Sequence, residues 1–177
     1  NNRTTYSSPV QVPGNSWKNV YMGSQFLATK VDGTLWAWGY NGGGGLGQNN
    51  LTEYSSPVQV PGTTWDKVDS FPNPGSTAIK TDGTLWAWGD NTNGRLGLNN
   101  QTKYSSPAQI PGTTWSIARC GTNSGYGIRT DGTLWSWGLN QRGELGLNTK
   151  DNPSQSPVQI PGTTWANVYP GIECSLG

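Results

Sequence analysis

The stretch Asp32-Gly33-Thr34-Leu35-Trp36-Ala37-Trp38-Gly39 decides the fold. It recurs unchanged at 82–89, and again at 131–138 with serine in place of the alanine, so its spacing is close to 50 residues. Asp-Gly is typical of the tight turn of a β-hairpin, and the residues that follow it favour a strand. Alternation along that strand puts leucine and alanine on one face and the two tryptophans on the other. Both faces are therefore apolar, as in a sheet that is covered on both sides.

Two further blocks repeat with the same period. Ser8-Pro9-Val10-Gln11-Val12-Pro13-Gly14 returns in similar form from Ser56, Ser106 and Ser156, and a tryptophan follows each first proline after eight residues. The other block, Asn41-x-x-Gly44-x-Leu46-Gly47, has copies that begin at Asn91 and Asn140. A period near 50 residues indicates repeated supersecondary units. The repeats run over 8–55, 56–105 and 106–155, followed by an incomplete one over 156–177.

Each repeat predicts about four short antiparallel strands. Residues 18–22, 25–31 and 34–38 have strand-like patterns, and 58–60 lie between two prolines, which places that strand at an outer edge. We therefore expect an all-β protein, a single partial β-propeller domain over 1–177 with about three complete four-stranded blades and some partial strands. Its tryptophan doublets should pack between blades, since each buried indole removes ~150–250 Å² from water. The doublets are Trp36, Trp38, Trp86, Trp88, Trp135 and Trp137.

Composition excludes several classes of function. The 177 residues carry 11 Lys and Arg and 10 Asp and Glu, scattered along the chain, and the formal net charge is +1. We therefore expect no nucleic-acid partner, and no membrane insertion either, because no apolar run approaches ~20 residues. The chain contains no histidine, the commonest general base and metal ligand. We expect no catalysis, no metal and no other cofactor.

The recurring turns of the repeat predict structure, and its variable positions predict binding. Asp32, Asp82 and Asp131 occupy equivalent positions, which a two-residue hairpin turn explains. By contrast, the connections between the first and second strands differ in length and sequence. Loops of a propeller that vary over a fixed scaffold acquire partners. The candidate ligand-binding residues are three aromatic residues expected to be exposed and three polar residues near them, namely Tyr40, Phe71, Asn73, Asp90, Asn123 and Tyr126.

The cysteines and the glycosylation patterns leave alternatives open. Cys120 and Cys174 are the only cysteines, and two reduced buried thiols are favoured over a bridge between neighbouring blades. Asn2, Asn50 and Asn100 each begin an Asn-x-Thr pattern at an equivalent repeat position. A repeated turn rich in Asn and Thr produces such patterns without glycosylation.

The stretch Asp-Gly-Thr-Leu-Trp-Ala-Trp-Gly, followed by Asn-x-x-Gly-x-Leu-Gly, resembles the repeat of the regulator of chromosome condensation family. The similarity in style is to bacterial and viral, alpha-tubulin suppressor-like members. It implies a seven-bladed ring, whose remaining blades would come from the same longer chain or from a second copy.

The resemblance also implies a function. It suggests a non-catalytic binding or structural module that is exposed outside the cell, on a cell surface or a virion, and recognises a protein or a glycan. The alternative that it implies is guanine-nucleotide exchange on a small GTPase. A histidine commonly opens the second strand of the family's repeat, and Gln25 stands at that position here.

Overall fold

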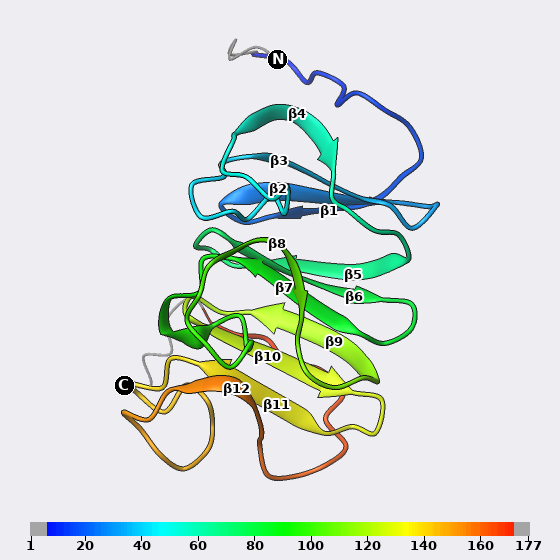
Figure 1. The fold of residues 1–177 in the computed structure, drawn as a ribbon. Coiled ribbons are helices and arrows are strands. Elements are labelled where there is room, and N and C mark those ends of the chain that lie inside the picture. The colour runs from blue at the N-terminus through cyan, green and yellow to red at the C-terminus, as the bar shows by residue number, and fades with distance from the viewer. Residues whose placement is uncertain (1–6, 172–177) are drawn as a thin grey trace.

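Three antiparallel sheets of four strands each follow one another along the chain (Figure 1). The computed structural model describes residues 7–171. Each sheet keeps its strands in sequence order, from the first strand at one edge to the fourth at the other. The first sheet contains β1 (Trp17–Met22), β2 (Gln25–Lys30), β3 (Leu35–Gly39) and β4 (Tyr54–Gln59). The second contains β5 (Trp65–Ser70), β6 (Gly75–Lys80), β7 (Leu85–Gly89) and β8 (Tyr104–Gln109). The third contains β9 (Trp115–Cys120), β10 (Ser124–Arg129), β11 (Leu134–Gly138) and β12 (Ser154–Gln159). A short 3-10 turn, η1 (Thr92–Gly94), lies between β7 and β8 of the second sheet.

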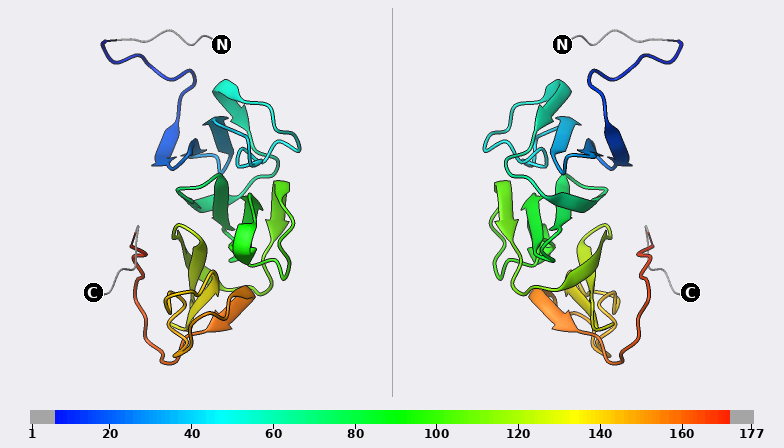
Figure 2. Two further views of the ribbon diagram at one scale, coloured as in Figure 1. Left: turned by 90° about the vertical axis from the view of Figure 1, so that its left-hand side faces the viewer. Right: turned by 90° about the vertical axis from the view of Figure 1, so that its right-hand side faces the viewer.

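The connections divide between two rims of the stacked sheets. One rim, here called the hairpin face, holds the turns between the second and third strands, at 31–34, 81–84 and 130–133. The opposite rim, the loop face, holds the short loops at 23–24, 71–74 and 121–123 and the long loops at 40–53, 90–103 and 139–153. All the variable connections therefore share one face. In Figure 1 the long loops lie on the left and the hairpin turns on the right, and Figure 2 turns first the loop face and then the hairpin face toward the viewer.

The Asp-Gly turns have the structural role that the sequence predicts. The carboxylate of Asp32 accepts hydrogen bonds from the Thr34 backbone N–H at 2.9 Å and from its hydroxyl at 2.7 Å. Gly33 has a φ of +80°, a conformation that favours glycine. The other two copies repeat these contacts within 0.1 Å. The repeated aspartates therefore build turns.

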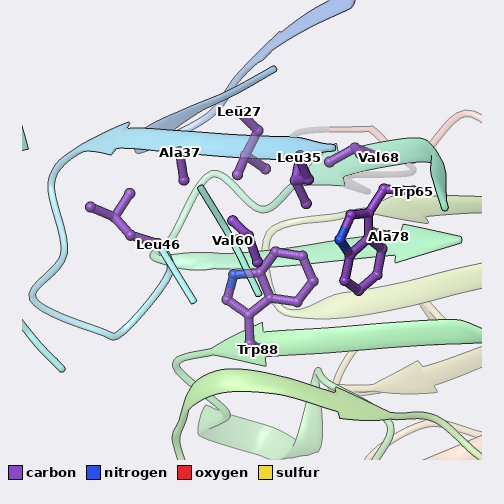
Figure 3. Packing of buried hydrophobic residues seen from close by; sticks show 9 residues of the cluster. All are labelled: Leu27, Leu35, Ala37, Leu46, Val60, Trp65, Val68, Ala78 and Trp88. Atoms are coloured by element: carbon purple, nitrogen blue, oxygen red, sulfur yellow. The ribbon is translucent and has the colours of Figure 1, made fainter. Parts of the chain in front are cut away.

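Apolar side chains fill the spaces between neighbouring sheets. Between the first and second sheets, Leu35 and Ala37 of β3 meet Trp65 and Trp88 (Figure 3). Between the second and third, Leu85 and Ala87 of β7 meet the equivalent tryptophans in the same way. The strand β7 of the second sheet thus presents its two faces to two different neighbours, as its alternating pattern predicts. This sheet-to-sheet packing is that of propeller blades.

The two tryptophans of each doublet have different environments. Trp88 and Trp137 are fully buried, and each indole N–H donates across the sheet interface to a backbone carbonyl, that of Gly45 or of Arg95, at 2.8 Å. Trp86 and Trp135 are half-buried at the margins of the same cores. Both members of these doublets therefore pack at the contacts between blades, but it is the second member that is fully buried and joins the sheets by a hydrogen bond.

The first tryptophan of each doublet pairs within its own sheet. The rings of Trp65 and Trp86 lie 6.2 Å apart at 83°, and the Lys80 ammonium lies 4.7 and 4.5 Å from their centroids. The first and third sheets repeat this arrangement with Lys30 and Arg129. A cation is attracted to the negative faces of aromatic rings, so each sheet contains one cation–π contact between a basic side chain and two of its own tryptophans.

The first sheet has one face that no neighbouring sheet within residues 7–171 covers. Val20 of β1 is 58% exposed there, whereas its equivalent in the second sheet, Val68, is 4% exposed. Phe26, 41% exposed, stacks on Trp38 with centroids 5.5 Å apart. Trp36 and Trp38 therefore lie on a sheet face that would have to be covered in a closed ring. Within residues 7–171, no helix is long and apolar enough to cross a membrane.

Candidate functional site

The loop face differs most between the three sheets. Its short loops have two, four and three residues, at 23–24, 71–74 and 121–123, as the sequence predicts. The long loops are anchored alike, since the side chain of the first asparagine, Asn41 in the first sheet, accepts from Leu46 N–H and donates to the carbonyls of Asn50 and Thr52. Asn91 and Asn140 use the same kind of contacts. A rigid frame therefore carries loops of different chemistry.

Four of the predicted ligand residues gather around a buried arginine. Arg95 is 2% exposed and forms an ion pair with Asp90, whose backbone oxygen also accepts from its Nε at 2.9 Å. The Arg95 Nη1 lies 3.4 Å from Asn123 Oδ1, and the Asn73 Nδ2 lies 3.5 Å from the same oxygen. The guanidinium carbon lies 5.8 Å from the centroid of the Phe71 ring. We call these five residues the Arg95 cluster; it joins the long loop of the second sheet to the short loops of the second and third.

Two of the predicted ligand residues are buried rather than exposed. Phe71 is fully buried in the core between the second and third sheets, and Tyr126 is 8% exposed. The Tyr126 hydroxyl donates to the Glu144 carbonyl at 2.8 Å, so it holds the long loop of the third sheet. The expectation that these two rings are exposed is wrong, because the longer loop at 71–74 folds Phe71 inward and because Tyr126 lies within the buried strand β10 rather than in a loop. The sequence could not show which side of the loop Phe71 takes.

Arg95 is not among the site residues that the sequence predicts. The equivalent positions in the other two sheets hold Gly45 and Glu144. That difference was the available signal, since a long cationic side chain replaces glycine within a packed loop. Burial lowers the pKa of Arg95, and the charge of Asp90 opposes this effect.

The Asp90 carboxylate has three side-chain partners. It pairs with Arg95, with the Lys103 ammonium at 3.0 Å and with the Thr92 hydroxyl at 2.9 Å. Burial raises the pKa of Asp90, but the contacts with Lys103 and Thr92 and the charge of Arg95 outweigh burial, so the pKa lies below its usual range. The carboxylate therefore contributes stability above the ordinary aspartate pKa of about 3.9, and this contribution is lost as the pH falls through the lower pKa of the folded state.

We expect Asp90→Asn to reduce the free energy of unfolding at pH 7 by about 2 kcal/mol, because it leaves the buried guanidinium without its carboxylate. The difference between wild type and variant should shrink as the pH falls through the folded-state pKa of Asp90. Urea unfolding at a series of pH values measures both effects.

Two comparisons make this experiment specific. Burial raises the pKa of Asp69, although hydrogen bonds from the backbone of Cys120 and Ser70 oppose this effect. Protonation of Asp69 at low pH therefore changes the free energy of unfolding in the opposite direction to protonation of Asp90. Asp69 is present in both wild type and Asp90→Asn, so the difference between these two proteins isolates the effect of Asp90. Asp66→Asn, which removes an exposed 3.2 Å ion pair with Lys18, should cost less than about 1 kcal/mol. A difference that does not depend on pH would contradict the assigned role of Asp90.

Tyr40 remains an exposed aromatic residue of the loop face. It is 48% exposed and lies at the start of the long loop of the first sheet. A cavity of about 360 Å³ lies beside it, lined by Gly39, Tyr40, Glu53, Tyr54 and Ser55. A Cβ on Gly42 would come within 2.2 Å of the Tyr40 Oη, so the glycine makes room for the ring. Tyr40 does not belong to the Arg95 cluster. It is an exposed aromatic residue, whereas the cluster consists mainly of charged and polar side chains around a buried arginine.

The model of the regulator of chromosome condensation (RCC1) repeat matches residues 32–68, 82–124 and 131–168. These segments cover more than half of the chain. The chain belongs to the RCC1 repeat family. No curated protein matches it by sequence.

Solved RCC1-type structures share the fold of the chain. The crystal structure of human WBSCR16 superposes with a TM-score of 0.75 at 24% identity, covering 89% of this chain and 44% of that one. The structure of Prp20p from Saccharomyces cerevisiae gives a TM-score of 0.72 at 17% identity, covering 84% of this chain and 39% of that one. The chain thus spans less than half the length of these structures.

At the position where the family resemblance implies a histidine, this RCC1 chain uses Gln25 to join two blades. Gln25 is 1% exposed, and its Nε2 lies within 2.7–3.0 Å of Gly75 O, Ser76 Oγ and Ser70 Oγ of the second sheet. A buried amide that spans two sheets in this way stabilises their contact. Gln25 is therefore explained by structure.

The remaining sequence candidates also have structural explanations. Asn50 and Asn100 direct their amide nitrogens inward, toward the phenol oxygens of Tyr54 and Tyr104 at 3.3 and 3.0 Å. Cys120 is a free thiol 3.3 Å from the Thr77 hydroxyl, whereas Asn2 and Cys174 lie outside the described residues. In the described part of the chain, no group of three or more His, Cys, Asp or Glu side chains could hold a metal ion.

Proposed function

We propose that this RCC1-type chain is a non-catalytic, protein-binding propeller segment whose loop face recognises the partner. The observation that carries the proposal is the division between a fixed scaffold and variable loops. The same turns and asparagine anchors recur in all three sheets, and the sheet-joining tryptophans in the second and third, while the short and long loops change length, charge and aromatic content on one rim. Binding residues commonly lie on such loops over a rigid frame.

The similar structures support a protein partner. Prp20p has binding properties to Gsp1p and histones, and a second structure shows Kap60 bound to yeast RCC1. The fold is therefore able to present protein-binding surfaces. A glycan ligand, and a location on a cell surface or a virion, stay proposals that rest on the style of the repeat and its low charge.

We also propose that further blades cover the open face of the first sheet. The face carries Val20, Phe26 and Trp38, whose equivalents in the second sheet are covered by the first. Those blades would come from a longer chain or from a second copy, and size-exclusion chromatography with light scattering distinguishes the two. If the 19.0 kDa chain stays monomeric, a second copy does not cover this face.

We expect loop-face variants to lose a partner that a hairpin-face variant keeps. The immobilised chain is used to capture proteins from an extract of the source organism, and bound proteins are quantified by mass spectrometry. Tyr40→Ala, Asn73→Ala and Asn123→Ala should each reduce recovery of a true partner, by about fivefold or more at an energetically important contact. Val31→Ser, at a position on the hairpin face that is 70% exposed, is the matched control.

Each outcome decides between candidates. A partner lost with the loop-face variants alone supports the proposal, whereas equal recovery with all variants contradicts it. A hit on a glycan array that depends on the same residues would replace the protein partner with a glycan. Accelerated nucleotide release from a small GTPase would favour the exchange-factor alternative.

A further inference from the structure

The open face of the first sheet differs in composition from its counterparts in the other two sheets. We call the face of a sheet that carries the second tryptophan of its doublet the leading face. One row of paired side chains crosses each leading face from the first strand to the third. The rows of the first, second and third sheets are, in this order, Met22, Phe26 and Trp38; Ser70, Ser76 and Trp88; and Cys120, Gly125 and Trp137. Large apolar side chains thus replace small ones in the sheet whose leading face is open.

The small residues of the second and third rows shape the contacts between sheets. The hydroxyls of Ser70 and Ser76 lie 3.0 and 2.8 Å from Gln25 Nε2 of the first sheet. A Cβ on Gly125 would lie 2.3 Å from Trp137 Nε1. The missing side chain therefore leaves this indole free to reach the carbonyl of the preceding sheet. Both contacts between sheets depend on a small residue opposite the second tryptophan.

Phe26 gives the first sheet a different surface. Its ring stacks on Trp38 with centroids 5.5 Å apart and planes within 7°. Around this stack, Val20, Met22 and Phe26 are 58%, 76% and 41% exposed. A sheet that packed here as the described sheets pack would meet an aromatic ring in place of serine or glycine, and overpacking destabilises a core. The face instead fits a flat apolar surface.

The third sheet of a second copy is not free to supply that surface in the manner of a preceding blade. Where the first two sheets meet, the Trp65 backbone N–H donates to the Gly33 carbonyl of the preceding hairpin turn at 2.9 Å. The equivalent carbonyl of the third sheet, that of Gly132, already accepts from Trp165 of its own chain at 3.0 Å. Head-to-tail stacking of copies would have to displace Trp165.

We propose that two copies of the chain associate through the leading faces of their first sheets, related by a two-fold axis. This inference rests on the proposed covering of the open face and specifies the cover as the same face of a second copy. In a two-fold contact the same patch of both copies meets, so Val20, Met22 and Phe26 are buried against apolar side chains. The face of a four-stranded sheet of this size measures about 350 Å² in plan, toward the low end for specific interfaces, so we expect a weak dimer.

The test is sedimentation velocity of the full chain at loading concentrations from about 5 to 200 µM. We expect a monomer–dimer equilibrium with a Kd on the order of 10 µM. Raising NaCl from about 0.1 to 1 M should not weaken it, because salt screens charges and leaves apolar contacts intact. Met22→Ser and Phe26→Ser introduce the residues that the second sheet has in this row. Each should weaken dimerisation about tenfold.

A matched control and a second measurement make the result specific. Val31→Ser also removes an exposed apolar side chain, but from the hairpin face, and should leave the Kd unchanged. Amide hydrogen exchange of residues 17–22 should slow as the concentration of the wild-type chain rises, and should not do so in Phe26→Ser. Circular dichroism of each variant shows whether the fold is kept.

Three results would overturn the proposal: a wild-type chain that is monomeric at the highest concentration, dimerisation that Phe26→Ser leaves unchanged, and assemblies larger than a dimer that grow with concentration. If the chain is monomeric while partner capture still depends on Asn73 and Asn123, self-association is wrong and the protein-binding function stands. If the chain dimerises through Phe26 but no captured protein depends on the loop face, the protein-binding proposal fails instead.

Discussion

Trp88→Ala is expected to lower the free energy of unfolding by about 3–5 kcal/mol, as large aromatic truncations in packed cores do. The side chain is fully buried between the first and second sheets (Figure 3). Its removal leaves a cavity against Leu46 and Val60 and deletes the hydrogen bond to the Gly45 carbonyl. That carbonyl then keeps only its 3.0 Å contact with the Ser76 hydroxyl. Urea unfolding followed by circular dichroism measures the loss.

The repeat supplies a matched control for this variant. Trp38 has the equivalent position in the first sheet, where no described sheet covers it and its neighbour is Phe26. Trp38→Ala should therefore cost only about 1–2 kcal/mol, the loss of its ring contacts with Phe26 and Trp17. Equal costs for Trp38→Ala and Trp88→Ala would contradict the inference that the second tryptophan of the doublet stabilises the chain by joining blades.

The repeat made the scaffold predictable because the same strand, apolar on both faces, occurs three times along the chain. Apolar residues on both faces of a strand require two covering neighbours, and only stacked sheets supply them to every copy. The Asp-Gly turns and the edge position of the outer strands followed from backbone chemistry alone, although β4 begins at Tyr54 and contains Pro57 rather than beginning after it. The strands in the structure accordingly recur with the sequence period, although each outer strand, such as β4, contains the first residues of the next sequence repeat.

The sequence predicts where the variable loops lie, but it does not predict which side chains in them contact one another. The sequence predicts Asn73, Asp90 and Asn123 as variable polar residues of this face, and the structure brings them together around Arg95. Nothing in a single sequence states that a loop lengthened to four residues turns Phe71 into the core. Such orientations depend on packing between sheets, which local patterns do not encode.

Gly89→Ala is the second change with a large expected effect. A Cβ at this position would lie 2.4 Å from Gly75 Cα and 2.6 Å from the Pro74 carbonyl, both of them backbone atoms. The residue also has a φ of +108°, which L side chains rarely adopt. Strain and overpacking together should lower the free energy of unfolding by about 3–4 kcal/mol.

The equivalent glycine of the first sheet separates the two causes. Gly39 has nearly the same φ, +99°, but the nearest atom to its Cβ would be Phe26 Cδ2 at 3.5 Å. Gly39→Ala should therefore cost about 1–2 kcal/mol, the conformational part alone. Equal losses in urea unfolding would show that the close approach of β6 to β7 costs nothing, contrary to the geometry.

Gly89→Ala should also disturb the loop face. The Asp90 backbone N–H donates to the Pro74 carbonyl at 2.7 Å, so a side chain that pushes Pro74 away moves Asp90 and Asn73 apart. Shifts of the Asn73 and Asn123 amides in NMR spectra of Gly89→Ala, absent from spectra of Gly39→Ala, would show this coupling. The glycine that lets two strands approach each other thus also sets the position of the side chains that are proposed to meet the partner.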